Sequence, residues 1–364
     1  MLKKIIVNPI GYHEKFVSLY TILQLIKEVI MRSLVTIQRV KMLSPIPDSD
    51  FLEAAHIMGW QCVVKKGEFN VGDPGVYFEV DSFLPEDPRY EFLRASSYRD
   101  NEDNGKGFRI RTMRLRGQLS QGLFIPLVQF PELADFNEGD DVTEILQVKK
   151  WYIPETSTPG GTIIGDRPNG IPASDEIRIQ SALELLDQLQ DKPYYITTKM
   201  DGTSGIVYYI DGKIGCCSRN KEIKDEENAL YWVPVYKFGL KEKLAALGKN
   251  MVITGEICGP GIQKNKLRLP AIEWYVFDVK DWDSGRYLPY DELCETCALL
   301  GVSVVPMEER GDHFAYSLET LLEKAKGKYP SGLEKEGIVV RDVMAPKAVS
   351  FKVLNNDFLL KEKD

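Results

Sequence analysis

Histidine is the scarcest of the common metal-binding and acid–base residues in this sequence, with three in 364 positions. Cysteine is also sparse. Its six occurrences exclude a dense disulfide framework and favour a reducing compartment, which we take to be the cytoplasm. The one Cys-x-x-Cys pair, Cys294 and Cys297, has no second pair to complete a zinc site. We interpret it as part of a packed helix over residues 291–300, with a zinc or redox site as the alternative.

Long hydrophobic runs and an excess of positive charge are missing as well. No run reaches the ~20 apolar residues that a membrane-spanning helix needs, so we expect no membrane partner. A net charge of −8 excludes a protein that is basic overall, so basic residues that contact nucleic acid would have to be gathered locally. With 43% hydrophobic and 27% charged residues, the chain has the composition of a globular protein of about two domains.

Residues 1–31 differ in pattern from the rest of the chain. The apolar stretch 17–30 is interrupted by Gln24, Lys27 and Glu28, a pattern typical of an amphipathic helix, and no small-residue cleavage site comes after it. Met31 opens a strand-like segment. We therefore expect residues 1–31 to be an optional N-terminal extension with a non-native start, and a membrane-surface role is the alternative.

Residues 32–150 show many short strands between turns. Strands are expected at residues 60–64, 76–80, 108–112 and 123–128. About five strands with few helices favour a small closed barrel, the OB-fold. Four arginines crowd this otherwise acidic region, and they suit either phosphate binding or a solvated strand face: Arg109, Arg111, Arg114 and Arg116.

A Pro-, Gly- and Thr-rich segment, residues 151–175, predicts a linker or an ordered lid at the boundary between two domains. Residues 176–364 then read as an α+β domain. Apolar residues from Ile179 to Leu189 fall on one helical face, which predicts a helix before the next strand.

The most informative stretch is Lys199-Met-Asp201-Gly202. Strand-like residues lead into it at 193–196 and out of it at 204–210, and Asp211-Gly212 predicts a two-residue hairpin turn. Lys199 therefore stands where a strand ends, and Gly202 lets the backbone turn. Such a lysine can face a ligand at the mouth of a sheet, although an ordinary charged turn has the same pattern.

Downstream strands repeat this arrangement of a buried strand with a polar or aromatic residue near one end. The polar and aromatic residues at these strand ends are Arg219, Glu256, Phe277, Glu336 and Lys352.

Three further basic residues, Lys264, Lys266 and Arg268, alternate along the sequence. They could lie on a strand edge that tracks a nucleic-acid backbone, or they could face solvent.

Taken in order, these segments resemble the nucleotidyltransferase motifs of the lysyl-adenylate superfamily of ATP-dependent RNA and DNA ligases and capping enzymes. Three further segments, 60–68, 114–122 and 256–263, resemble the Deinococcus/Naegleria-type RNA ligases, which carry an OB domain in front. The resemblance covers about residues 33–364. The only barrel-like segment precedes Lys199, and few residues come after Lys352, an order expected of this family and of neither DNA ligases nor capping enzymes.

The resemblance implies a role for each matching residue. Lys199 would be the nucleophile that takes AMP, with Glu336 and Lys352 also catalytic. Glu256 and Glu336 would hold Mg²⁺ or Mn²⁺, partly through water. The nucleotide would be bound by Thr198, Arg219 on the ribose, Glu256, Phe277 stacked on adenine, and Arg178, with Lys361 a weaker candidate.

The chemistry agrees with this assignment, because a covalent lysyl-AMP splits a difficult joining step into easier ones. A free lysine has a pKa of about 10.4, so neutralising it near pH 7 needs about 4–5 kcal/mol of differential stabilisation. We expect a bound metal together with Arg219 and Lys352 to lower that pKa.

The resemblance thus implies an ATP-dependent RNA ligase for RNA repair, acting on 5′-phosphate and 3′-OH ends. We expect nicks in RNA or RNA/DNA duplexes whose 3′-OH strand is RNA, and a monomeric enzyme. The alternatives are a DNA ligase, a capping-type guanylyltransferase and a non-catalytic OB-type nucleic-acid-binding protein.

Overall fold

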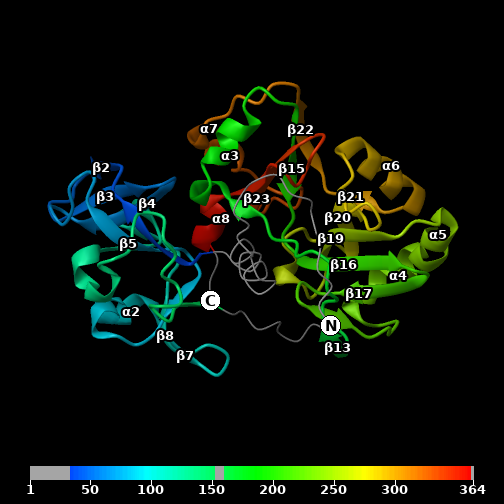
Figure 1. The fold of residues 1–364 in the computed structure, drawn as a ribbon, viewed down its shortest axis with the longest axis horizontal. Helices are drawn as coiled ribbons and strands as arrows, with labels where there is room; N and C mark the ends of the chain where they lie inside the picture. The colour runs from blue at the N-terminus through cyan, green and yellow to red at the C-terminus, as the bar shows by residue number, and fades with distance from the viewer. Residues whose placement is uncertain (1–32, 152–159, 362–364) are drawn as a thin grey trace, which may run out of the picture. The chain divides into compact units, whose positions relative to one another are not determined.

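The computed structural model describes residues 33–151 and 160–361, and from Leu34 on these residues form one compact unit. Figure 1 shows its helices and strands. The expectations for residues 1–31 lie outside the described residues. No helix in the described part of the chain has the length and apolar character to cross a membrane.

The N-terminal region is built from short antiparallel strands, as expected for an OB-fold. β5 is the central strand of one sheet, between β1 and β11, and its residues Val76, Tyr77 and Phe78 are buried. The strands of this region are β1 (Val35–Arg39), β2 (Met42–Pro45), β3 (Leu52–Ile57), β4 (Trp60–Lys65), β5 (Pro74–Phe78), β6 (Ser82–Leu84), β7 (Tyr98–Asn101), β8 (Gly105–Arg109), β9 (Thr112–Leu115), β10 (Gln118–Gln121), β11 (Leu123–Pro126) and β12 (Lys149–Lys150). A short 3-10 helix (Pro88–Leu93) and α2 (Arg94–Ser97) lie between β6 and β7.

The C-terminal region holds two larger sheets. The first has seven strands in the order β13-β18-β17-β16-β19-β20-β21. Its strands are β13 (Ile163–Asp166), β16 (Thr203–Ile210), β17 (Lys213–Cys217), β18 (Lys221–Ile223), β19 (Met251–Cys258), β20 (Glu273–Asp281) and β21 (Ser303–Val304). β13 belongs to the segment expected to be a linker, so part of that segment is a sheet strand.

Three helices pack on this seven-stranded sheet; in Figure 1 two of them stand beside β16 and β17 and the third beside β20 and β21. Leu244, Leu293 and Cys297 from these helices join the same apolar core as Val207 and Ile253 of the sheet. The helices are α4 (Val233–Phe238), α5 (Leu240–Leu247) and α6 (Tyr290–Leu300). The expected helix over 291–300 is therefore confirmed, and all six cysteines are free thiols.

The second sheet has five strands in the order β14-β24-β23-β15-β22. These are β14 (Ile177–Arg178), β15 (Tyr194–Lys199), β22 (Met307–Gly311), β23 (Gly337–Asp342) and β24 (Ser350–Leu354). Ile196, Ile338 and Val340 pack on one face with residues of α3 (Glu184–Leu189) and α7 (Leu318–Lys324). The alternating residues of each strand, Lys199 among them, belong to the opposite face, because successive side chains of a strand alternate.

The helix expected over residues 179–189 is shorter than the sequence indicates. A 3-10 turn (Ile179–Ser181) precedes α3, and Ala182 between them has an extended φ of −148°. The turn is bound by the N-terminal region instead: Gly59 donates its backbone N–H to Gln180 O over 3.0 Å, and the indole of Trp60 donates to Ser181 Oγ over 3.1 Å. These bonds favour a tight turn over continuation of the helical pattern.

The predicted hairpin at Asp211-Gly212 is confirmed. Both residues have positive φ, 50° and 76°, and they join β16 to β17 in antiparallel register. Two positive φ angles match the right-handed twist of the flanking strands, which is why Asp-Gly is favoured at such turns.

Candidate active site

Lys199 is the last residue of β15, and its amine meets a carboxylate from the neighbouring strand. In the β15–β23 ladder, Lys199 is opposite Gly337, the first residue of β23, and Glu336 immediately precedes that strand. The distance from Lys199 Nζ to Glu336 Oε2 is 2.7 Å, and both side chains are about four-fifths buried. Two residues that are far apart in the sequence are therefore held together by strand register.

Gly202 permits a third group to approach. A Cβ at this position would lie 2.3 Å from Ile257 O and 2.9 Å from Glu256 Cγ, distances that no side chain tolerates. We expected Gly202 to let the backbone turn, but its φ is not positive, and what excludes a side chain here is close packing against β19. This packing brings Glu256 beside Lys199 and Asp201.

The carboxyl groups of this cluster are hard to ionise together. Burial, reinforced by the charges of Glu336 and Asp201 and opposed by Lys199, raises the pKa of Glu256 to about 8. Burial and repulsion from Glu336 likewise raise the pKa of Asp201 to about 6, although Lys266 Nζ lies 3.2 Å from Asp201 Oδ2. The three carboxyl groups outnumber Lys199 and Lys266, and a cation bound beside them would favour their ionised forms.

The charge state of Lys199 differs from our expectation. Burial favours the neutral amine, but the carboxylates of Glu336, Glu256 and Asp201 favour the ammonium, and together they raise the pKa of Lys199 above its usual value. We expected nearby cations to lower it. In this structure the lysine is surrounded by acids, and the lowering of its pKa by a bound metal together with Arg219 and Lys352 stays a prediction.

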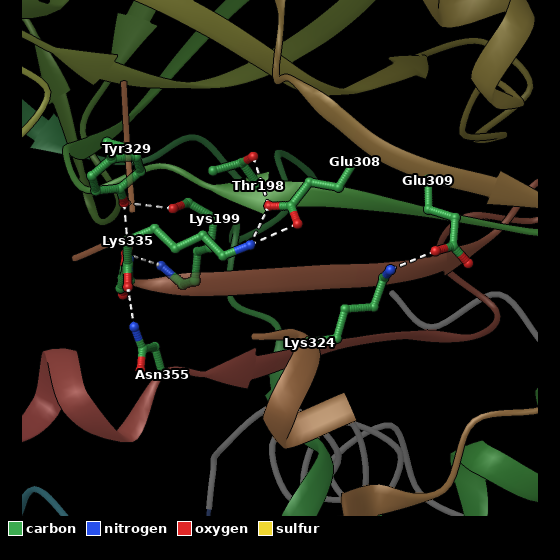
Figure 2. Close-up of polar contacts among 9 residues, drawn as sticks. Thr198, Lys199, Glu308, Glu309, Lys324, Tyr329, Lys335 and Asn355 are labelled. Carbon is green, nitrogen blue, oxygen red and sulfur yellow. Dashed lines mark hydrogen bonds and ion pairs between the residues drawn. The ribbon is translucent and has the colours of Figure 1, made fainter. Parts of the chain in front are cut away.

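Figure 2 shows polar groups around the end of the β15–β23 ladder that carries Lys199. The hydroxyl of Tyr329 donates to Lys199 O over 2.7 Å and accepts from Glu336 N over 3.1 Å. Lys335 Nζ contacts both carboxylate oxygens of Glu308 at 2.6 Å. Sequence reasoning found none of Tyr329, Lys335 and Glu308, because their partners are backbone groups or residues on other strands.

The hydroxyl of Thr198, which we expect to bind the nucleotide, has a protein partner in this structure. Its Oγ1 donates to Glu308 Oε1 over 2.9 Å, as Figure 2 shows. Thr198 directly precedes Lys199 in β15, and successive side chains of a strand point to opposite faces, so Thr198 belongs to the other face of the sheet. Its hydroxyl therefore supports the strand from behind.

Phe277 occupies an irregularity in β20. Thr254 is opposite Asp278 and Gly255 is opposite Val276, so Phe277 is the extra residue of a bulge. Val276 and Val279 enter the core under the helices, whereas Phe277 lies 5.7 Å from Arg341 Cζ on the other side. A bulge re-aims a side chain in this manner.

Beneath Phe277 lies a second charged cluster, the Arg341 network, defined as Arg341, Lys347, Glu176 and Asp278. Arg341 Nη2 and Lys347 Nζ are 2.8 and 2.5 Å from Glu176 Oε1, and Lys347 Nζ is 2.8 Å from Asp278 Oδ2. Burial raises the pKa of Glu176, but Arg341 and Lys347 outweigh it and lower that pKa to about 2. This network is electrically balanced.

The remaining expected lysine, Lys352, lies on β24 opposite Val339 of β23. Val339 is also opposite Thr197 of β15, so the side chains of Thr197, Val339 and Lys352 share one face of the sheet. Lys199 is two residues after Thr197 and therefore belongs to the same face. Parallel pairing with β14 also puts Lys352 next to Arg178.

Arg178 and Arg219 each have an acidic partner. Arg178 is buried and its Nη2 lies 3.0 Å from Asp81 Oδ2, so this arginine joins β14 to the N-terminal region. Arg219 comes after β17 and forms an ion pair with Asp175. Arg219 O also accepts from Arg167 Nε over 3.0 Å.

The strand edge expected at residues 264–268 does not exist. Gln263–Asn265 form a 3-10 turn, and Lys264 and Arg268 have φ of 60° and 54°, which no strand adopts. Lys266 instead reaches Asp201 and lies 3.5 Å from the ring centre of Phe358. Lys361, at the end of α8 (Asn356–Lys361), pairs with Glu334 at 3.0 Å.

The four N-terminal arginines do not form one cluster. Arg109 is buried, with its guanidinium 4.9 Å from the ring of Trp151 and 3.8 Å from Asp81. Arg114 is exposed on β9, and Arg116 is in the turn to β10 with a φ of 51°. The expected choice between a phosphate site and a solvated face therefore applies only to the exposed members.

The donors near Lys199 fit a hard divalent ion. Among the described residues, no three His, Cys, Asp or Glu side chains are arranged to enclose a metal. Mg²⁺ commonly takes one or two protein carboxylates and completes its shell with water and phosphate oxygens. Glu336 and Glu256 supply carboxylates of this kind. Cys297 is buried in the core and burial raises its pKa to about 12, which fits the packing interpretation.

Comparisons with known proteins agree with this geometry. The profile of an OB-fold domain matches residues 34–127, and the profile of the RNA ligase family matches residues 192–354. A structure of Naegleria gruberi RNA ligase with PPi is 37% identical, with a TM-score of 0.85, covering 90% of this chain and 98% of that chain. A mutant of that ligase with ATP and Mn gives the same identity, TM-score and coverage. Another mutant, with AMP and Mn, is 36% identical, with a TM-score of 0.87, covering 92% and 100%. No curated protein sequence matches the chain.

Proposed function

The chain belongs to the RNA ligase family, and we propose that this ATP-dependent RNA ligase seals 5′-phosphate and 3′-OH ends at nicks through an adenylate on Lys199. The observation that carries the proposal is the position of the Lys199 amine, 2.7 Å from Glu336 and within a buried acidic cluster. An amine can be a nucleophile only after it loses its proton, and buried carboxylates are suited to a cation that would displace that proton.

In the first step, the lone pair of Lys199 Nζ attacks the α-phosphorus of ATP. A P–N bond forms, the bond from that phosphorus to the bridging oxygen of the β-phosphate breaks, and pyrophosphate leaves with the electron pair. The amine loses one proton before the attack and a second one after it, and both pass to solvent. An oxygen of the 5′-phosphate then attacks the adenylate phosphorus, and the P–N bond breaks with its electron pair returning to Lys199 Nζ. Finally the 3′-OH loses its proton and attacks the phosphorus of the 5′-phosphate, so that the phosphodiester forms as AMP leaves with the electron pair.

Glu336 and Glu256 are the residues that would hold Mg²⁺ or Mn²⁺, partly through water. When bound, such an ion neutralises charge on the transferring phosphoryl group. The carboxylates of the site have a second effect of their own. Because they raise the pKa of Lys199, they keep its amine protonated and unreactive until positive charge is brought to them.

The nucleotide would lie on the face that carries Lys199 and Lys352. Phe277, re-aimed by the bulge, would stack on adenine, and Arg341 behind it fixes the depth of the ring. Lys352 would contact the AMP phosphate and Arg219 the ribose. For Arg178 we propose an indirect role, because its ion pair with Asp81 and its pairing beside Lys352 support β24.

The finer substrate assignment is also a proposal. Resemblance to nick-sealing ligases supports an RNA strand at the 3′-OH side, with RNA or DNA at the 5′-phosphate. Free cysteines support a reducing compartment such as the cytoplasm, and we propose that the enzyme is a monomer.

Labelling of the protein by nucleotide tests the proposal. Wild-type protein incubated with [α-³²P]ATP and Mg²⁺ should retain label, and it should seal a nick with an RNA 3′-OH. Lys199→Ala should lose both activities by at least about 10³-fold, because no other amine replaces the nucleophile. Retention of label by Lys199→Ala, or label from GTP in place of ATP, would refute the assignment.

A further inference from the structure

Tyr329 joins the two backbones that carry the reactive groups. Its hydroxyl donates to Lys199 O and accepts from Glu336 N, and the two hydrogen bonds measure 2.7 and 3.1 Å. The side chain is 4% exposed, and 130 residues separate Tyr329 from Lys199 in the sequence. Figure 2 shows the ring beside the end of β15.

The location of this bridge matters because the ladder ends there. Lys199 and Gly337 are the last pair of the β15–β23 register, and Glu336 lies beyond it. No β15–β23 ladder pair includes Glu336, so this ladder does not by itself fix the distance between Glu336 and Lys199. Tyr329 supplies the missing restraint through a single oxygen atom that contacts both residues.

The other side of Glu336 is held independently. Asn355 N donates to Glu336 O over 2.9 Å, and Asn355 Nδ2 donates to Lys335 O over 3.0 Å. Gly337 allows this approach, because a Cβ there would lie 2.1 Å from Val353 O. Glu336 is thus fixed to β24 by Asn355, whereas the Tyr329 hydroxyl ties it to the backbone of Lys199.

We propose that Tyr329 is a positioning residue that sets the distance between the Lys199 amine and the Glu336 carboxylate during adenylation. This proposal rests on the function proposed above. A displacement of about 1 Å between reacting groups can change a rate by about 100-fold, so removing one bridging oxygen should slow the chemistry without removing any reacting group. The phenol remains protonated, because burial raises the pKa of Tyr329.

The test compares Tyr329→Phe with Tyr316→Phe in the full-length protein. Tyr316 is a matched control, because its hydroxyl donates to Glu309 Oε1 over 2.7 Å on the helix-covered face of the same sheet. Single-turnover labelling with [α-³²P]ATP gives two quantities for each variant: the final labelled fraction and the rate constant. Mg²⁺ is varied to give the concentration for half-maximal rate.

A positioning role predicts that Tyr329→Phe keeps the wild-type labelled fraction while its rate constant falls about 10- to 100-fold and its half-maximal Mg²⁺ concentration rises. Tyr316→Phe should match wild type in all three. A rate constant within about twofold of wild type overturns the proposal, whether or not the labelled fraction falls, because loss of folded protein changes the fraction alone. Should Tyr329→Phe not fold, Asn355→Ala is the second variant: it removes the side-chain hydrogen bond to Lys335 O next to Glu336 and keeps the backbone bond to Glu336 O, and it must also lower the rate constant.

Failure of this inference is distinguishable from failure of the proposed function. A normal rate for Tyr329→Phe together with an unlabelled Lys199→Ala leaves the nucleophile in place and removes only the positioning role. A labelled Lys199→Ala removes both.

Discussion

Two charged clusters of the C-terminal region are built from similar residues and have opposite electrostatics. Around Lys199, the carboxyl groups Glu256 and Asp201 have raised pKa values of about 8 and 6. In the Arg341 network, Glu176 has a pKa lowered to about 2. Both clusters are buried, so burial does not explain the difference. The ratio of cations to carboxylates does.

The difference separates a site for chemistry from a structural support. A balanced network pairs its charges within the protein and holds β20, β23 and residue 176 together. A cluster with surplus carboxylates is not satisfied by the protein, and it favours binding of a cation and an exchange of protons. The largest consequence of this comparison is on activity, where loss of Lys199 should abolish labelling while Arg341 acts through the fold.

Replacing Arg341 should break the balanced network. In Arg341→Met, the carboxylates of Glu176 and Asp278 lose a buried partner, and the free energy of unfolding should fall by about 3–5 kcal/mol. Denaturant unfolding measures the change. Arg310→Met is the matched control, because Arg310 pairs with Asp291 on the surface and should unfold at nearly the wild-type midpoint. Equal midpoints for Arg341→Met and Arg310→Met would contradict the assignment.

Replacing Glu256 should change how the stability of the protein depends on pH, which distinguishes the Lys199 cluster from the Arg341 network. The folded-state pKa of Glu256, about 8, lies above its usual value of 4.5, so the folded protein binds more protons between these pH values. The contribution of Glu256 to stability is therefore complete below about pH 4.5 and is lost as pH rises towards 8. Metal-free Glu256→Gln should gain stability relative to wild type between about pH 5 and pH 8, on the order of 1–3 kcal/mol.

Melting temperatures at several pH values, measured in the presence of a chelator, track this gain. Glu176→Gln provides the contrast. The pKa of Glu176 is depressed, so its stabilisation is present above its usual value of 4.5 and is lost only as pH falls towards about 2. Glu176→Gln should therefore be less stable than wild type throughout the same range. If the difference in melting temperature between Glu256→Gln and wild type does not vary with pH, Glu256 ionises normally.

The smallest expected effect concerns the two faces of β15. Thr198→Val removes the hydroxyl that donates to Glu308, so the free energy of unfolding should fall by about 1 kcal/mol. The rate of labelling should stay within about twofold of wild type, because the hydroxyl lies on the face opposite to Lys199. A tenfold loss of rate with an unchanged melting temperature would place the hydroxyl at the nucleotide instead.

Strand ends were the part of the site most accessible from sequence. Lys199 ends β15 and Glu336 directly precedes β23, so their pattern predicted both the sheet and the position at its mouth, whereas Glu256, expected at a strand end, lies within β19 (Met251–Cys258). The fold class, an OB-fold and then an α+β ligase domain, was predicted from the order of these segments and is confirmed.

Other features had no local signal. Tyr329 binds backbone groups, and any residue type supplies those, so no motif marks its partners. The alternation of Lys264, Lys266 and Arg268 was misleading because a left-handed backbone at two of these positions replaces the strand. The charge of Lys199 depended on how many carboxylates the register collects, which spacing along the chain does not reveal.

The pairing of β15 with β23 also sets an order of assembly. β15 lies between β22 and β23, and both come more than a hundred positions later in the chain, so its hydrogen-bonding edges stay open during synthesis until those late segments arrive. Contacts between such distant segments form slowly, because a long loop must close first. A nascent chain halted before residue 336 therefore has the lysine but not its acidic neighbour, and labelling by ATP should appear only after β23 has been synthesised.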